Sequence, residues 1–197
     1  MARYATVAEL KAWLDVAGAA QDANLGLALS AAEDSIDQWC NRRFDLSATA
    51  TARYYTASPG FVDVDDIGSS TGLVVASDSG TDGVYETTWT VEALTGYGFS
   101  LDPVNADSKG RPWVRLVASS SSFPTRRRGV KVTAQWGWPA VPGDIKTATL
   151  IKAGRIWKRK DTPFGIFGTV DTGFTRLGGE DQDVKTILGP YRKLMLG

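Results

Sequence analysis

DANLGLALSAAEDSIDQWCN, residues 22–41, carries the clearest structural signal in the chain. Its apolar residues recur every three or four positions, and its carboxylates fall between them. A helix with 3.6 residues per turn places such positions on one face. The spacing therefore predicts a helix with one buried stripe, whose candidate core residues are Leu25, Leu29, Ile36 and Trp39.

Three further helices are expected near the two ends of the chain. Thr6 and Glu9 fit a capping box, in which each side chain accepts a hydrogen bond from the backbone N–H of the other residue. Another helix should occupy residues 145–160. The last should begin near Asp183, and Pro190 should kink or divide it because proline has no backbone N–H.

The middle of the chain is typical of β-strands. Short segments rich in β-branched and aromatic residues alternate with Gly, Ser, Asp and Pro clusters, at residues 53–56, 61–67, 73–76, 85–93, 113–117 and 130–136. The expected fold class is therefore α+β. N-terminal helices (1–50) and C-terminal helices with a Gly-rich loop (138–197) should form a small helical bundle, and residues 51–137 a β-rich insertion.

Composition argues against catalysis. The 197 residues include no histidine, which removes the commonest general base and metal ligand. No nucleophile elbow or phosphate-binding loop occurs, so we expect no catalytic residue, metal or cofactor, and no enzyme. Two stretches that begin at Asp63 and Asp78 imitate a calcium loop, but Val74 and Trp89 stand where its closing glutamate belongs.

Two other absences limit the partners and covalent links of the chain. A bilayer-spanning helix needs about 18 consecutive apolar residues, and no run approaches that length, so no membrane partner is expected. The single cysteine, Cys40, excludes an internal disulfide.

The charge is balanced overall, with 22 basic and 22 acidic side chains, but it is unevenly distributed. Residues 1–50 are acidic and residues 138–197 are basic, which indicates either attraction between neighbouring molecules or two ordinary solvated faces. Arg126, Arg127 and Arg128 form the strongest basic cluster. They are candidates for contact with phosphate or an acidic partner, and the alternative is a solvated loop before the strand at residue 130.

Several segments, taken in order, resemble the head–tail connector (adaptor) proteins of tailed bacteriophages. They are YATVAELKAWL (4–14), IDQWCNRRF (36–44), VTAQWGWPAVP (132–142), IWKRKD (156–161) and LGPYR (188–192). The β-rich section matches only in being present, and the smallest members of that family are nearly all helical.

The resemblance implies a structural ring protein, typically of twelve copies, beneath the portal protein. Such a ring extends the channel through which viral DNA passes without sequence recognition, and receives the next neck or tail protein, a stopper or tail terminator. The expected location is the neck of the virion, with host cytoplasm during assembly. Family members reach the portal through C-terminal segments, so the resemblance points to Tyr191, Arg192 and Leu194 as contacts with the portal or a neighbouring subunit.

Three other functions remain open from the sequence. The chain could be another neck or tail-completion ring protein, a β-rich binding module supported by helices, or a carboxylate-based hydrolase. The isolated chain is expected to be monomeric or weakly associated, with its ring stabilised on the portal.

Overall fold

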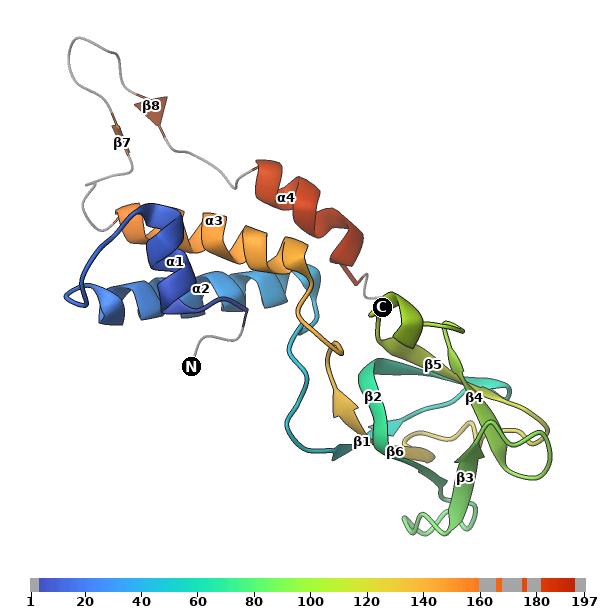
Figure 1. Ribbon diagram of the computed structural model, residues 1–197. Coiled ribbons are helices and arrows are strands. Elements are labelled where there is room, and N and C mark those ends of the chain that lie inside the picture. Colours follow the sequence, from blue (N-terminus) through green and yellow to red (C-terminus); the bar gives the residue numbers. More distant parts are fainter. Residues whose placement is uncertain (1–3, 160–165, 168–174, 177–181, 194–197) are drawn as a thin grey trace. The chain divides into compact units, whose positions relative to one another are not determined.

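The computed structural model describes residues 4–159, 166–167, 175–176 and 182–193 (Figure 1). The chain divides into two compact units: the helical unit, residues 1–44 and 141–197, and the barrel unit, residues 45–140. The predicted mixed α+β class is confirmed: the described residues form four α-helices and a sheet-rich part that contains a small barrel. None of the described helices is long and apolar enough to cross a membrane.

Helix α3 is the common neighbour in the helical unit. It contacts each of the other helices described there. The elements are α1 (Val7–Leu14), α2 (Asp22–Cys40), α3 (Gly143–Arg159), α4 (Gln182–Leu188) and the 3-10 turn η3 (Gly189–Tyr191), with a short antiparallel pair of β7 (Ile166–Phe167) and β8 (Thr175–Arg176). The last α-helix ends at Leu188, and Pro190 lies in η3. This is the division expected from a proline, which has no backbone N–H.

The capping box at the start of α1 is present. The Thr6 hydroxyl accepts from Glu9 N at 3.2 Å, and Glu9 Oε2 accepts from Thr6 N at 2.8 Å. The other carboxylate oxygen, Glu9 Oε1, accepts from the Lys146 ammonium of α3, so one side chain caps α1 and ties it to α3. The helix ends at Leu14, where Asp15 takes a left-handed conformation, and does not continue to Gly18.

The buried face of α2 requires one correction to the predicted stripe. Leu25, Leu29 and Ile36 are fully buried, but Trp39 is only half-buried. The adjacent Cys40 is fully buried in its place. Trp39 lies in the last turn, one residue before Cys40, where the helix ends. Its cover there includes the Arg192 guanidinium, 5.4 Å from the indole centroid, so the ring lies at the edge of the core.

The start of the chain is fastened along α2. Tyr4 N donates to Oε1 of the buried Glu33 at 2.8 Å, and the Tyr4 hydroxyl donates to Asp37 at 2.5 Å. The same hydroxyl accepts from Phe44 N at 3.0 Å, just after the helix ends. Because these groups give the Glu33 carboxylate and the Tyr4 phenol polar partners, both can lie buried without the full cost of desolvation.

The barrel unit is one six-stranded sheet that closes on itself. Its order is β1-β6-β2-β3-β4-β5, and β2 also pairs with β5. The long β2 makes this possible, because its first part pairs with β5 and its later part with β6 and β3. The strands are β1 (Thr51–Tyr55), β2 (Phe61–Ser77), β3 (Thr87–Val91), β4 (Gly98–Asp102), β5 (Trp113–Ala118) and β6 (Val130–Trp136).

Side chains bridge β1 to the start of β2. Arg53 Nη1 donates to Asp65 Oδ2 at 2.6 Å, and the Tyr55 hydroxyl donates to the same oxygen at 2.9 Å. Asp65 N returns a hydrogen bond to that hydroxyl at 3.3 Å. Burial, followed by the Asp65 charge, raises the pKa of Tyr55, so the phenol remains a donor at neutral pH. Strand β1 is the end strand of the sheet and pairs through its backbone with β6, so these side-chain contacts link its other edge to β2.

Strands β3 and β4 are parallel neighbours joined by only six residues, 92–97. Parallel strands usually need a connection of about a dozen residues or more. The short connection is possible here because Glu92 and Gly96 adopt positive φ angles of 57° and 68°. Gly98 also allows a close approach, since a Cβ atom there would lie 1.8 Å from Ala93 O.

The entry and exit of the barrel unit run side by side. Ser47 N donates to Trp136 O at 2.8 Å, and Trp136 N donates to the Ser47 hydroxyl at 2.7 Å. Immediately after this pair, Gly137 has φ +114°, and a Cβ atom there would lie 1.9 Å from Asp45 O. Only glycine fits this crossing, both for its backbone conformation and for its space.

Substitution Gly137→Ala is expected to destabilise the protein by about 2–5 kcal/mol, because it adds both backbone strain and a clash with backbone. Chemical denaturation measures the change in unfolding free energy. Gly60→Ala is the matched control, since no atom lies within 4 Å of its added Cβ and its φ is not positive. If Gly137→Ala and Gly60→Ala lowered the unfolding free energy equally, the requirement for glycine at position 137 would be contradicted.

The Glu9 contacts predict a pH dependence of stability. The Lys146 ammonium and then the Thr6 N–H lower the pKa of Glu9 from 4.5 to about 2. A depressed folded-state pKa contributes stability above pH 4.5 that is lost as the pH falls from there toward 2. Unfolding free energies of wild type and Glu9→Gln should therefore converge over this acid range; curves that stay parallel would contradict the contribution.

Candidate functional site

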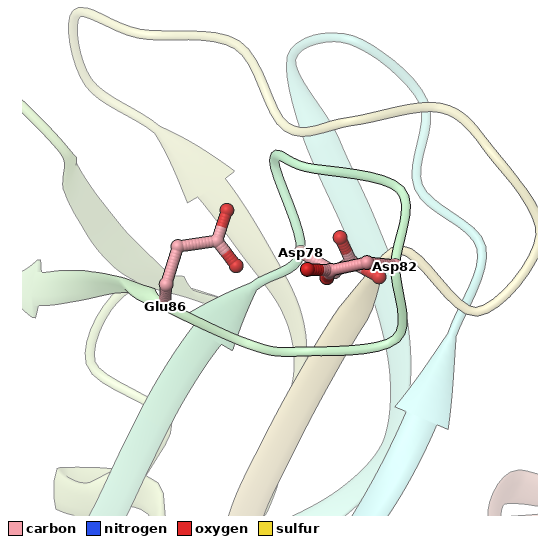
Figure 2. A group of neighbouring side chains, drawn as sticks. All are labelled: Asp78, Asp82 and Glu86. Atoms are coloured by element: carbon pink, nitrogen blue, oxygen red, sulfur yellow. The ribbon is translucent and has the colours of Figure 1, made fainter.

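The loop between β2 and β3 gathers three carboxylates. The oxygens of Asp78, Asp82 and Glu86 lie within 4.8 Å of one another, and Figure 2 shows the first two close together inside the loop. Such a group has the ligand chemistry for a hard cation. It is therefore the first site to test for function, although the sequence predicts no metal here.

Each of these carboxylates already has partners. Asp78, which is fully buried, accepts from Thr81 N at 2.7 Å and Gly83 N at 2.8 Å and pairs with the Arg126 guanidinium. Glu86 Oε1 accepts from Ser79 N and Gly80 N at 2.8 and 2.9 Å, and Asp82 accepts from Val84 N at 2.9 Å. The carboxylates therefore hold the loop in shape by binding its own backbone.

The three arginines have different surroundings. Arg126 is half-buried and, besides the Asp78 carboxylate, donates to Asp78 O from Nε and Nη2 at 3.3 and 3.2 Å. Arg127 is exposed. Arg128 lies over the Tyr54 ring, 4.6 Å from its centroid. Arg126 therefore stabilises the loop between β2 and β3, whereas Arg127 and Arg128 lie at the surface.

Arg128 belongs to a group that we call the aromatic–cation patch: Tyr54, Tyr85, Arg128 and Lys131. The two tyrosine rings are 5.5 Å apart, and the Lys131 ammonium lies 5.1 Å from the Tyr85 centroid. The backbone of Arg128 is fixed, since its carbonyl accepts from the Tyr85 hydroxyl at 2.7 Å and its N–H donates to Thr56 Oγ1 at 3.2 Å.

Sequence reasoning missed the tyrosines of this patch because no aromatic residue neighbours the arginines along the chain. The pairing of β1 with β6 sets Tyr54 opposite Lys131, and the loop after β2 brings in Tyr85. The alternation along residues 130–136 predicts which face of the strand Lys131 lies on. It does not predict which strand pairs with it, because that depends on long-range pairing.

The C-terminal candidates lie against the helical unit. The Tyr191 ring packs edge-on to Phe44 at 5.7 Å, and its hydroxyl donates to Asp144 Oδ2 at 2.9 Å. Arg192 is exposed above Trp39, and Lys193 N donates to Cys40 O at 2.8 Å. Leu194 lies outside the described residues. Tyr191 therefore fastens this segment, and Arg192 is the one of the pair at the surface.

Two tryptophans exchange their expected roles. Trp138, in a Gly-Trp-Pro turn, is expected to be a surface anchor and Trp13 a core residue. Trp138 is instead 5% exposed and Trp13 is 54% exposed. The turn follows the close crossing at Gly137, which leaves little solvent around Trp138, whereas Trp13 lies in the short helix α1 near its exposed end.

No known family model matches the chain, and no curated protein matches it by sequence.

Solved structures do share its fold. A chain in a structure of the neck of an empty GTA particle, computed with C6 symmetry, superposes with TM-score 0.58 at 17% identity, covering 98% of this chain and 93% of that one. One from the neck of a native GTA particle with C12 symmetry gives 0.55 at 18%, covering 97% and 91%. Another, from the virion of a native gene transfer agent (GTA) particle, gives 0.52 at 18%, covering 98% and 93%. The shared fold thus spans both units.

The partners of Asp78 predict that the loop is built without calcium. Asp78→Ala should cost roughly 3–5 kcal/mol, because it leaves the Arg126 guanidinium and two backbone N–H groups without their buried acceptor. Glu86→Gln, at an exposed position, should cost about 1 kcal/mol or less. Thermal unfolding with calcium or with a chelator should give the same midpoint; a saturable rise with calcium would contradict this assignment.

Proposed function

We propose that this chain is a structural neck protein of a tailed phage or phage-like particle. In this role copies of the chain form a ring, of twelve subunits, below the portal. The ring extends the DNA channel and receives the next neck or tail protein, a stopper or tail terminator. The chain works by contact and by shape, and not as an enzyme.

One observation carries the proposal: the fold match to neck chains extends over nearly the whole of both chains. A match confined to the barrel would point to a common binding module, because small barrels serve many functions. Here the helices and the barrel recur together, in particles whose necks were computed with C6 and C12 symmetry. Rings of this kind need two different surfaces on each subunit, which a closed head-to-tail arrangement brings together.

The chemistry of the described residues supports a non-catalytic role. The one carboxylate cluster among them has backbone and arginine partners. The chain has no histidine to act as a general base near neutral pH. A hydrolase of the two-carboxylate type would need acids free to meet a substrate, and this cluster is occupied by its own loop.

The proposal also gives Arg192 a role as a contact with the portal or a neighbouring subunit, and Leu194 is a candidate beside it. Tyr191 positions the segment through Phe44 and Asp144. An arginine held above an indole keeps its N–H groups free at the ring edge, where they can bind a carboxylate of a partner.

A second candidate is another ring protein of the same neck or of tail completion. It rests on the same fold match, because the matching chains come from structures of the particle neck. Imaging separates the two candidates, since an adaptor must touch the portal directly.

The test is to express an epitope-tagged chain together with the particle that its gene accompanies and to image the purified particles. Labelled density as a ring against the portal is the expected result. A ring further down the neck would favour the second candidate, and particles without the tag would refute a structural role in the neck.

Arg192→Glu should reduce attachment to portal-bearing particles while leaving the thermal midpoint within a few degrees of wild type, because Arg192 is exposed. Tyr191→Phe, which removes only the hydrogen bond to Asp144, is the matched control and should lower stability by about 1 kcal/mol. Normal attachment of Arg192→Glu would remove this residue from the contact.

A further inference from the structure

The connection between β3 and β4 exposes an apolar tip, which we call the β3–β4 tip: residues 91–97. Leu94 is 84% exposed, and Val91 and Tyr97 are about half exposed. Glu92 is exposed at the base of the same connection. A leucine left in solvent on a loop contributes nothing to the fold, and an apolar group of several side chains on one loop is typical of a contact surface.

The C-terminal side of the tip is anchored to neighbouring segments. The hydroxyls of Ser120 and Ser121 donate to Gly96 O at 2.7 and 2.8 Å, and Thr90 N donates to Tyr97 O at 2.8 Å. The Tyr97 ring packs edge-on to Trp89, which stacks on Phe123. A loop fixed before binding loses little conformational entropy when it binds, so the fixed tip is suited to dock as a unit.

The aromatic–cation patch has the complementary chemistry. Tyr54 and Tyr85 offer two tilted ring faces, and Arg128 and Lys131 offer cations beside them. Such a surface is complementary to an apolar side chain, which packs on the rings, with a carboxylate of a nearby residue beside the cations. The β3–β4 tip presents that pair of groups, Leu94 and Glu92.

The tip and the patch cannot meet within one barrel unit. Tyr85 precedes the first residue of β3, and Glu92 follows its last residue. The five residues of β3 that lie between them span roughly 16 Å, at about 3.3 Å per residue. The two surfaces therefore lie toward opposite ends of the strand, and complementary surfaces at opposite ends join different copies head to tail.

We propose that the β3–β4 tip of one copy docks on the aromatic–cation patch of a second copy, with Leu94 against the two tyrosine rings and Glu92 beside Arg128 and Lys131. In the ring of the proposed function, this contact would be an interface between the barrel units of neighbouring subunits. Only this placement in a ring rests on the proposed function. Self-association through these two surfaces is a property of the chain itself.

Thiol cross-linking tests the contact with both surfaces intact. Ala52→Cys lies two residues from Tyr54 on β1, and Thr95→Cys lies beside Leu94; both positions are exposed. The native Cys40 can stay, since it is buried and burial raises its pKa to about 11, which keeps it unreactive at neutral pH. A short bismaleimide should convert the double variant into a ladder of dimers, trimers and larger species.

Three controls define the surfaces. Each single-cysteine variant should remain monomeric, because a head-to-tail contact never brings two identical positions together. Ala52→Cys with Val104→Cys should also give no ladder, since Val104 is an exposed apolar residue on a different loop, the one after β4. Cross-linking of a single variant, or an equal ladder with Val104→Cys, would overturn the proposal.

Charge reversal supplies a second measurement on the double-cysteine chain. Glu92→Lys or Lys131→Glu alone should slow ladder formation about tenfold, and the two together should restore most of the rate. Absence of a ladder at chain concentrations up to about 1 mM, where even a millimolar contact is populated, overturns the proposal. Tagged particles test the neck role separately, so a tagged ring without this cross-link would refute the contact alone.

Discussion

The close crossing at Gly137 is the constraint on which the barrel unit depends. The chain enters this unit at Asp45 and leaves it past Gly137, and a Cβ atom there would lie 1.9 Å from the Asp45 carbonyl oxygen. With this spacing, Ser47 and Trp136 exchange two hydrogen bonds, which align the end of β6 with the incoming chain. Strand β6, which ends at this crossing, pairs with both β1 and β2 and so decides which residues face each other on the sheet.

Local patterns predicted the helices well because the relevant forces act within a few residues. The Thr6 capping box, the apolar spacing along α2 and the break at Pro190 all operate over one or two turns. Trp39 differs because its exposure depends on what reaches the last turn of α2 from the other end of the chain. Periodicity indicates the face of a helix, but the partner that covers each turn is set by tertiary packing.

The strands were predicted less completely, and the candidate surfaces least. Residues 61–67 and 73–76 read as two strands, yet they belong to one β2 that bends through register shifts. Strand β4 was not predicted, because it lies parallel to β3 after a connection shorter than such pairs usually have. Tyr54, Tyr85 and Arg128 are separated by 31 to 74 residues in the chain, and the sequence alone contains no signal that they meet.

The hydrogen-bonded entry and exit have a consequence for how this architecture can vary. Since Ser47 and Trp136 are in contact, the residues between them form a closed loop. The distance between the ends of this loop does not depend on its length. Loop-closure entropy grows only slowly with length, so a short turn could replace the whole loop at small thermodynamic cost. The barrel unit can therefore be shortened or replaced between these two residues. Insertions and deletions in its loops leave the Ser47–Trp136 contact, and the ends of the helices that follow from it along the chain, in place.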